Sequence, residues 1–587
     1  MKNKEISKLL REIVASYIIK NEAKYRFQII AYQNAADSIE GLNTQIKDLY
    51  AEGNLDKIPG VGETIKKRLE ELLKTGQVKH FNEVKKGIPD STFILMEIPG
   101  FGPKKSYKLA AHFNLKNPEK AIDELLKFAK NNKIAGLEGF GEKSQADIIR
   151  SVDEYKKSMG KTTKMLLPYA HDIASDVLAY LKKSKYVEKS EALGSLRRMK
   201  PLVGDIDIAV ASKWPNETID YFTKYPGKER VIEKGPATSS LLTTAGNQID
   251  LMVQPPDSFG ALLQHFTGSK NHNIHLREIA LKKNLSLSER GIKNSKTKKL
   301  YKFEDEKKFY EAIGLTFIPP EIREDTGEIE LAQKNKLPKL IELKDIKGEF
   351  HIHSGFPIEP SHDLGINSIE EMIFQAKELG YEYIGFSEHN PSISKHKENQ
   401  LIDLIKRRND EIDKASQKFN FQTFKMMETD ILPDGSLALP EKALEILDAS
   451  VVSIHSVFKM DKNQMTDRII KGLTHPKAKI LAHPTGRLLN ERAGYEVDFD
   501  ILFDFCKKNN KILEINSYPN RLDLGDNLIR KAVEMMVKLV INTDSHASYQ
   551  MNNMIYGVSQ ARRGWASKDD ILNSLSYNEI KKEFKKN

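Results

Sequence analysis

Two short segments, Gly194-Ser195-Leu196-Arg197-Arg198 and Gly204-Asp205-Ile206-Asp207-Ile208, indicate the architecture of the middle of this chain. Apolar residues alternate with the two aspartates, which is the period of a half-buried strand. Successive side chains of a strand leave opposite faces, so Asp205 and Asp207 share one face. Taken alone, such a pair is more often a solvated edge or a salt-bridged pair than a catalytic one.

Three neighbouring features favour a catalytic site. Asp250 lies between two apolar residues in a second alternating run, so an adjacent strand can supply a third carboxylate. Gly194-Ser195 can bring backbone N–H groups close to a phosphate, and Arg198 adds a permanent positive charge. Carboxylates that converge bind Mg²⁺ together with substrate phosphates. With Phe266-Thr267-Gly268-Ser269 downstream, the pattern predicts a two-metal nucleotidyl-transfer site.

Composition sets the broad class. The chain has 587 residues, which predicts three to five domains. Its net charge is +10, which favours a polyanionic partner. The single cysteine, Cys506, excludes an intrachain disulfide and indicates a reducing compartment. We find no apolar run of membrane-spanning length and no signal peptide, so we expect a cytoplasmic protein without membrane contact. A monomer is the default expectation.

The first third contains a threefold repeat of the form Gly-hydrophobic-Gly, at residues 60–62, 100–102 and 139–141. One such motif is usually a simple turn between helices. Three of them, two followed by lysines, predict helix-hairpin-helix elements whose next helix presents free N–H groups to a DNA phosphate. The predicted DNA-binding residues are Gly60, Gly62, Lys66, Lys67, Gly100, Gly102, Lys104, Lys105, Gly139 and Gly141.

Beyond a proline-containing connector near residues 318–338, short apolar runs alternate with helical segments, and most of these runs end in a potential metal ligand. Ligands at the carboxyl ends of successive parallel strands meet at the mouth of a barrel. A single histidine in such a place is usually structural. Six histidines with two carboxylates predict a site for Zn²⁺, Mn²⁺ or Fe²⁺ that can cleave a phosphodiester.

Residues 1–335 resemble the family X DNA polymerases in the order of their hairpins, Gly-Ser-x-Arg-Arg, Asp-x-Asp, distal aspartate and Phe-Thr-Gly-Ser. The resemblance implies that Asp205, Asp207 and Asp250 bind two Mg²⁺ ions and that Asp250 helps to deprotonate the primer 3'-hydroxyl. The implied nucleotide-binding residues are Gly194, Ser195, Arg198, Gly204, His265, Phe266, Gly268, Asn273 and Arg277.

Several positions depart from that family's animal members. His265 stands where tyrosine is common, which bears on discrimination against ribonucleotides. Met199 replaces a glycine after the two arginines, and Gln248 replaces an arginine beside the third aspartate. Arg68 occupies the position of the lysine that forms a Schiff base with an abasic sugar. Because arginine stays protonated and is a very poor amine nucleophile, we expect weak or absent lyase activity.

The remainder resembles the PHP (polymerase and histidinol phosphatase) domain, a distorted (β/α)7 barrel with three metal ions. The implied ligands are His351, His353, His389, Glu428, His455, His483, Asp544 and His546. The family's further aspartate falls in a longer stretch here, where Asp363 is the candidate and Glu359 the second choice. Glu349 and Glu388 replace the aspartates that are usual before His351 and His389.

The expected chain is multidomain α/β. Its predicted parts are two helical domains (1–80 and 81–160), an α+β nucleotidyltransferase palm (161–260), a thumb (261–335) and the PHP barrel (336–587). The expected function is gap-filling DNA synthesis in base excision repair from gapped or primer-template DNA and dNTPs. The barrel would act as a Mn²⁺- or Zn²⁺-dependent 3'-5' exonuclease, with abasic-site endonuclease or 3'-phosphatase activity as further options. The alternatives are an RNA-directed or small-molecule nucleotidyltransferase, a barrel that acts on small phosphate esters, and an inactive scaffold barrel.

Overall fold

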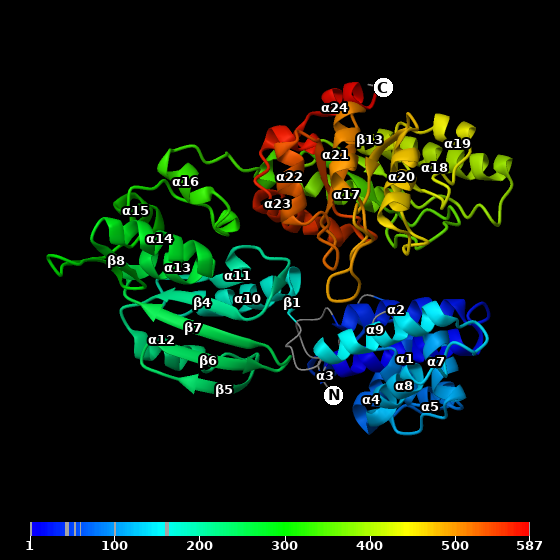
Figure 1. Cartoon of the computed structure of the whole chain (residues 1–587), viewed down its shortest axis with the longest axis horizontal. Coiled ribbons are helices and arrows are strands. Elements are labelled where there is room, and N and C mark those ends of the chain that lie inside the picture. Colours follow the sequence, from blue (N-terminus) through cyan, green and yellow to red (C-terminus); the bar gives the residue numbers. More distant parts are fainter. Residues whose placement is uncertain are drawn as a thin grey trace. The chain divides into compact units, whose positions relative to one another are not determined.

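The structure is a computed structural model of the chain, and it describes residues 3–40, 46–51, 55–58, 60–98, 101–158 and 164–585. The chain divides into two compact units, whose elements are labelled in Figure 1. The first unit contains Met1–Thr163, Thr223–Lys234 and Ser240–Ile249, and the second contains Lys164–Phe222, Gly235–Ser239 and Asp250–Asn587. Among the described residues, no helix is both long and apolar enough to cross a membrane.

The N-terminal region is helical. In α4 the residues Ile65, Leu69 and Leu72 recur at helical spacing and are buried, and Gly76 ends this helix in the left-handed conformation. One hydrophobic core draws on residues 6–84 and a second on residues 95–152. The elements are α1 (Asn3–Asn21), α2 (Arg26–Glu40), α3 (Ile46–Ala51), η1 (Leu55–Lys57), α4 (Glu63–Thr75), α5 (Lys79–Lys85), α6 (Ser91–Leu95), α7 (Pro103–His112), η2 (Pro118–Lys120), α8 (Ala121–Lys130) and α9 (Glu142–Ser158).

The palm contains a five-stranded sheet of order β2-β4-β7-β6-β5 and a two-stranded ladder of β1 with β3. Strand β4 is almost wholly buried and pairs antiparallel with β2, and helix α13 covers it through Phe259, Leu262 and Leu263. The palm elements are β1 (Met165–Leu166), α10 (Leu167–Lys182), β2 (Lys189–Ala192), α11 (Gly194–Arg197), β3 (Leu202–Val203), β4 (Ile206–Ala211), α12 (Pro215–Phe222), β5 (Lys228–Lys234), β6 (Thr238–Thr243) and β7 (Gln248–Gln254).

The thumb packs its helices on a small antiparallel sheet of order β10-β9-β8. Buried ion pairs and hydrogen bonds stabilise the thumb. Glu306 binds both Arg197 and Arg323, and the buried His272 lies between Glu328 and Tyr310. Its elements are η3 (Pro256–Ser258), α13 (Phe259–Thr267), α14 (Lys270–Lys282), β8 (Leu285–Ser288), β9 (Gly291–Asn294), β10 (Leu300–Tyr301), α15 (Glu306–Ala312), η4 (Pro320–Ile322) and α16 (Glu328–Gln333).

The C-terminal region is a barrel of parallel strands. The ladders run β11-β12-β13 and β14-β15-β16-β17-β18, and single bridges from Ile352 to Ser545 and from His389 to Glu428 join them. Strands β13 and β14 follow each other almost directly, so seven strand positions surround the core, as a (β/α)7 barrel requires. The strands are β11 (Gly348–Ile352), β12 (Tyr383–Phe386), β13 (Gln422–Lys425), β14 (Glu428–Asp430), β15 (Ser450–Ser453), β16 (Ala478–Leu481), β17 (Ile512–Asn516) and β18 (Leu539–Asn542).

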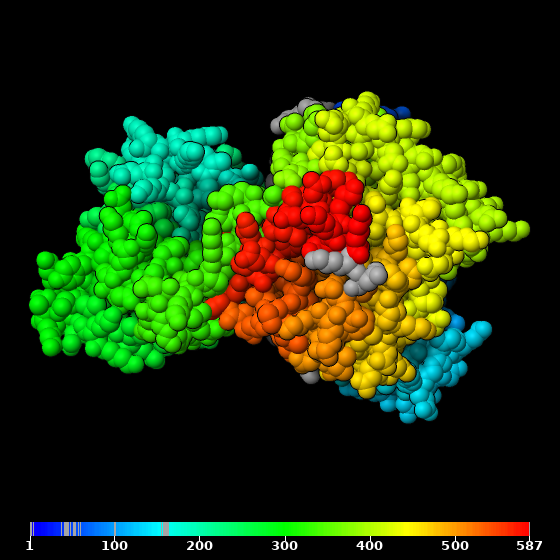
Figure 2. Space-filling view, turned by 90° about the horizontal axis from the view of Figure 1, so that it is seen from above, coloured from blue at the N-terminus to red at the C-terminus, as the bar shows by residue number. Residues whose placement is uncertain are grey.

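Helices alternate with these strands, and the last one closes the barrel. Ile580 and Phe584 of α24 are buried against Phe350 and Phe424 of the barrel core. Figure 2 shows the red C-terminal segment lying against the orange part of the chain that precedes it. The helices are η5 (Leu343–Asp345), α17 (Ile369–Glu378), α18 (Glu398–Phe419), α19 (Glu441–Glu445), α20 (Lys462–Leu473), α21 (Phe499–Lys508), α22 (Asp526–Glu534), η6 (Ser548–Asn553), α23 (Met554–Arg563), η7 (Lys568–Asp570), η8 (Leu572–Ser574) and α24 (Tyr577–Lys585).

Candidate active sites

The three palm carboxylates come from two adjacent strands. Asp207 lies on β4, Asp205 immediately precedes it, and Asp250 lies on the neighbouring β7. Burial, together with the nearby charges of Asp205 and Asp250, raises the pKa of Asp207 to about 7. The carboxylates are therefore close enough to repel one another. A bound cation would relieve this repulsion, so the donor set fits a divalent metal ion.

The Gly-Ser turn is built against the same carboxylates. Gly194 has a φ of 60°, and a Cβ atom there would lie 2.8 Å from Oδ2 of Asp207. The backbone N–H of Leu193 also donates to the carbonyl of Asp207 at 2.8 Å. Glycine is therefore favoured at this position, and the turn that includes Ser195 lies beside the aspartates. Gly204 faces open space instead, so its surroundings do not require the absence of a side chain.

The two arginines of this turn have different partners. Arg197 forms a two-pronged ion pair with Glu306, at 3.1 and 2.9 Å, and so joins the turn to the thumb. Arg198 donates from Nε to Glu324 at 3.1 Å and from Nη1 to the carbonyl of Thr267 at 2.7 Å. Its side chain is only 12% exposed. To hold a triphosphate, Arg198 must exchange its contact with Glu324 for one with phosphate.

The thumb residues expected to surround the nucleotide form one cluster at the end of α13. Asn273 donates to the carbonyl of His265 at 2.7 Å, and the rings of His265 and Phe266 meet edge to face at 4.8 Å. A Cβ atom on Gly268 would lie 2.6 Å from Oδ1 of Asn273, so glycine is needed there. Burial lowers the pKa of His265, and the nearby charge of Arg277 lowers it further. The structure thus places all five residues together.

Each hairpin of the N-terminal region is followed by a helix. Gly62 and Gly102 are the N-caps of α4 and α7, and α9 begins directly after Gly141. Gly60 and Gly139 take positive φ angles of 75° and 80°, which glycine tolerates best. Free N–H groups at these helix starts are suited to phosphate. Gly100 lies outside the described residues.

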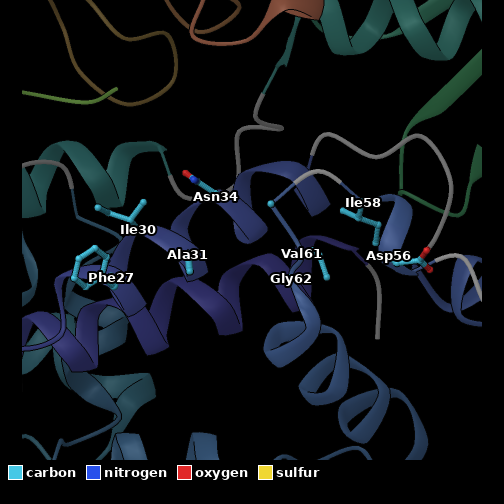
Figure 3. Close-up of a pocket in the computed structure, with 9 residues that line it drawn as sticks. Phe27, Ile30, Ala31, Asn34, Asp56, Ile58, Val61 and Gly62 are labelled. Atoms are coloured by element: carbon cyan, nitrogen blue, oxygen red, sulfur yellow. The ribbon is translucent and has the colours of Figure 1, made fainter. Parts of the chain in front are cut away.

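The lysines after the hairpins differ in their partners. Lys66 lies 3.5 Å from Asp56, and Lys104 lies 2.6 Å from Glu22. Lys105 stands over the ring of Phe101 at 4.1 Å, and Lys67 is exposed. The first hairpin also forms one wall of an open depression of about 670 Å³, whose other wall is α2 (Figure 3). Exposed ion pairs of this kind contribute little to stability, so these lysines can exchange their partners for DNA phosphates.

The centre of the barrel site is a single carboxylate. Glu428 is fully buried, and its Oε2 lies 3.2 Å from His351, 2.9 Å from His389 and 3.6 Å from His353. Its Oε1 lies 3.3 Å from His455 and 3.1 Å from His483. The side chains come from five different strand ends, so the barrel topology brings them together. One carboxylate amid five imidazoles would hold metal ions together with these histidines.

Two further carboxylates, Asp544 and Asp363, complete the cluster. Oδ1 of Asp544 lies 3.4 Å from His351 and 3.3 Å from His353. Asp363 reaches in from the loop after β11, with its oxygens 3.2 Å from His389 and 3.4 Å from His546. The Asp363 side chain is 74% exposed, and the neighbouring histidines hold its pKa below the usual value. The structure therefore places all nine candidate ligands at one barrel mouth.

The unpaired atoms of the cluster indicate that it binds metal. Several buried ring nitrogens and one oxygen of Glu428 have no hydrogen-bond partner, which is costly unless a cation occupies the space between them. Among the described residues, the groups of three or more histidine and acidic side chains whose ligand atoms lie within 4.8 Å of one another all belong to this barrel. Imidazole and carboxylate together suit Mn²⁺, Zn²⁺ or Fe²⁺.

Three supporting residues escaped the sequence analysis. Glu514 accepts from Nδ1 of His351 at 2.7 Å, and Asp430 is paired in the same way with His455 at 2.7 Å. Carboxylates in such positions fix the orientation of a ligand imidazole. His362 lies 3.1 Å from the other oxygen of Asp430. Glu514 ends an apolar run and Asp430 lies two residues after Glu428, so position alone offered a weak signal for both.

Glu349 and Glu388, which stand where aspartate is usual, stabilise the barrel. Glu388 accepts from Ser354 and forms a buried ion pair with Arg408 at 2.8 Å. Glu349 accepts from the N–H of Thr543 at 2.9 Å, and burial raises its pKa to about 8. Both side chains fix the strands that carry histidine ligands, so the longer side chains preserve the cluster.

Replacing Asp363 by alanine is expected to remove one metal ion from the barrel, because two of its neighbouring histidines would lose their shared acidic partner. Replacing Glu359 is expected to change nothing, since Glu359 lies beside His396, 3.2 Å away, outside the cluster. Metal content per chain, measured by mass spectrometry, checks this. Equal metal loss in the two variants would contradict the placement of Asp363.

The sequence matches known proteins in two separate segments and over its full length. A helix-hairpin-helix domain model matches residues 1–78, and a DNA polymerase beta thumb model matches residues 262–324. The DNA polymerase/3'-5' exonuclease PolX of Bacillus subtilis is 32% identical over 590 residues, covering all of both chains.

Two further relatives match separate parts. A probable phosphatase of Thermoanaerobacter sp. is 26% identical over 163 residues, which cover 26% of this chain and 64% of the relative. DNA polymerase lambda of Rattus norvegicus is 20% identical over 310 residues, which cover 49% of each chain. With the full-length match, these findings show that the chain belongs to the family X DNA polymerases that carry a C-terminal PHP domain.

Proposed function

We propose that this family X polymerase fills short gaps in DNA from dNTPs during repair, and that its PHP barrel shortens DNA 3' ends. The observation that carries the proposal is the presence of two complete donor sets on one chain. Three carboxylates lie beside a glycine turn in the palm, and nine metal-ligand candidates lie at the barrel mouth.

In the palm, Asp205, Asp207 and Asp250 would hold Mg²⁺, and Asp250 would take up the proton of the primer 3'-hydroxyl. When bound, two such ions lower the pKa of the attacking hydroxyl and stabilise the leaving pyrophosphate. The Gly194-Ser195 turn would bind the triphosphate through backbone N–H groups, with Arg198 as its counter-charge. The cluster of His265 and Phe266 would contact the incoming sugar.

In the barrel, Glu428 and Asp544 would hold Mn²⁺ or Zn²⁺ with the surrounding histidines. Such ions, when bound, supply hydroxide near neutral pH for attack on a phosphodiester. Glu514 and Asp430 keep His351 and His455 in the tautomer that leaves Nε2 free for a metal. The unpartnered nitrogens argue against an inactive scaffold, because a scaffold gains nothing from burying them.

The test uses DNA with a single-nucleotide gap and compares dNTPs with ribonucleotides in Mg²⁺. Incorporation of one dNTP opposite the template base is expected. Template-independent addition, or a requirement for an RNA template, would support the nucleotidyltransferase alternatives instead. The ratio of the two incorporation rates also measures how well His265 excludes the 2'-hydroxyl.

We predict that the first helical domain lacks a Schiff-base lyase. Arg68 stands at the expected position, its Nε is buried without a hydrogen-bond partner, and its charge lies close to the hydroxyl of Tyr32. A guanidinium cannot attack an aldehyde at neutral pH because it stays protonated. Borohydride should therefore trap no covalent adduct with a 5'-deoxyribose phosphate. A trapped adduct that survives in the Arg68→Ala variant would identify a lysine nearby as the nucleophile.

A further inference from the structure

One helix of the PHP barrel contacts the nucleotide turn of the palm. Helix α23 presents two side chains to the end of α11: Nε2 of Gln560 donates to the carbonyl of Met199 at 3.0 Å, and Nη1 of Arg563 donates to the carbonyl of Arg198 at 2.7 Å. Both side chains are buried. The last carbonyls of a helix have no partner within it, so another element must satisfy them, and α23 supplies two donors.

The conformation of Met199 explains why this support matters. Met199 has a φ of 54°, in the left-handed region where a residue with a side chain is disfavoured. This is the position at which the animal family members have glycine. The bond from Gln560 holds the carbonyl of the same residue, so the barrel stabilises a turn that glycine would adopt without help.

Arg563 also shares the carboxylate that holds Arg198. Glu324 lies 3.1 Å from Arg198, 3.2 Å from Arg563 and 3.3 Å from Lys200. If Arg198 turns to a triphosphate, Glu324 keeps two cationic partners and is not left as an uncompensated, largely buried charge. That exchange would be costly without Arg563, because an unpaired buried carboxylate is strongly destabilising. Arg563 thus lowers the free energy needed to release Arg198.

Helix α23 also packs against the metal-binding strands, through Gly557. A Cβ atom on Gly557 would meet Oγ of Ser517 at 2.0 Å and a methyl of Ile541 at 2.5 Å, so the helix lies directly on the end of β17 and on β18. Asn516, the last residue of β17, donates to the ligand Asp544 at 3.1 Å. One helix therefore touches the supports of both active sites.

We propose that Gln560 and Arg563 of the PHP domain are positioning residues of the polymerase site: they hold the Gly194–Met199 turn and free Arg198 to bind the triphosphate of the incoming nucleotide. The proposal rests on the gap-filling function proposed above. It assigns to the barrel a part in nucleotide binding that is separate from its own metal chemistry.

The test compares four variants of the 587-residue chain on single-nucleotide-gapped DNA: Gln560→Met, Arg563→Met, Arg563→Lys and Arg562→Met. Gln560→Met and Arg563→Met remove the donors with little change in volume. Arg562→Met is the matched control, because Arg562 lies on the same helix and binds Glu321 at 2.7 Å and the carbonyl of Ile341 at 2.8 Å, away from the turn. The rate of 3' shortening in Mn²⁺ reports whether the barrel remains folded.

The KM for the dNTP is expected to rise about tenfold in Gln560→Met and Arg563→Met, which is the loss expected for a hydrogen bond to a charged or strained group. The kcat should change little, because the triphosphate contact is made in the ground state as well. Arg563→Lys, which keeps the charge, should show a smaller rise, and Arg562→Met none.

An unchanged KM in both variants, or an equal rise in Arg562→Met, would overturn the proposal. If Arg563→Met also loses 3' shortening, the proposal is judged on the KM of Gln560→Met, because this substitution removes no charge from the contact between α23 and the turn. A wild-type protein that fills no gap would instead refute the proposed function, so the two failures are distinguishable.

Discussion

Asp207→Asn is expected to reduce dNTP incorporation at a single-nucleotide gap by at least about 10³-fold, because a metal-holding carboxylate contributes several kcal/mol to the transition state. The rate of 3' shortening by the barrel should stay at the wild-type value. Single-turnover incorporation with saturating dNTP measures the effect directly. Asp207 lies beside Gly194 and interacts electrostatically with Asp205 and Asp250, which places it at the centre of the three carboxylates.

Asp207→Asn is also expected to affect the thermal stability of the metal-free protein. Burial and two neighbouring carboxylates raise the pKa of Asp207, so the fold disfavours its ionised form when no metal is bound. Removing the charge should leave the melting temperature in a chelator unchanged or higher. The control is Asp257→Asn, which changes an exposed carboxylate of η3 that pairs with Lys302 at 3.1 Å. A lower melting temperature for Asp207→Asn alone would mean that Asp207 has a structural role instead.

Glu428→Gln is expected to reduce 3' shortening by about 10³-fold or more and to lower the metal content of the barrel, while gap filling continues. Glu428 is the shared neighbour of five histidines, so an amide in its place leaves them without the anion that holds cations between them. Metal analysis after gel filtration, together with the shortening rate of a labelled primer, checks both effects.

The matched control is Glu382→Gln in the same barrel, where the carboxylate is exposed and pairs with Lys347 at 3.2 Å. It should keep both the metal and the activity. Full shortening activity in Glu428→Gln would show that the nuclease lies elsewhere, and retained metal with lost activity would assign Glu428 a role in chemistry alone.

Much of both sites follows from local patterns. The alternation around Asp207 and Asp250 predicts adjacent strands, and adjacent strands necessarily bring these carboxylates together. In the barrel, ligand-type residues at strand ends predict the cluster, because parallel strands deliver their carboxyl ends to one mouth. Even Asp363, in a loop of unusual length, lies where the spacing suggested.

The interaction partners of the charged residues could not be predicted from local sequence patterns. Glu324 and Arg563 meet Arg198 across 126 and 365 residues of sequence, and no local period predicts such contacts. Asp430 and Glu514 act through hydrogen bonds to ligands, so only the three-dimensional arrangement reveals them. The sequence did flag Met199 as a departure, but its left-handed backbone and its support by α23 needed the structure.

The most direct test of two separate active sites is one primer-length assay on gapped DNA with Mg²⁺ and Mn²⁺. It compares the wild type with Asp207→Asn and Glu428→Gln. We predict that the first variant only shortens the primer and the second only extends it by one nucleotide. Loss of both activities in either variant, or shortening that survives in Glu428→Gln, would contradict the assignment of synthesis to the palm and cleavage to the barrel.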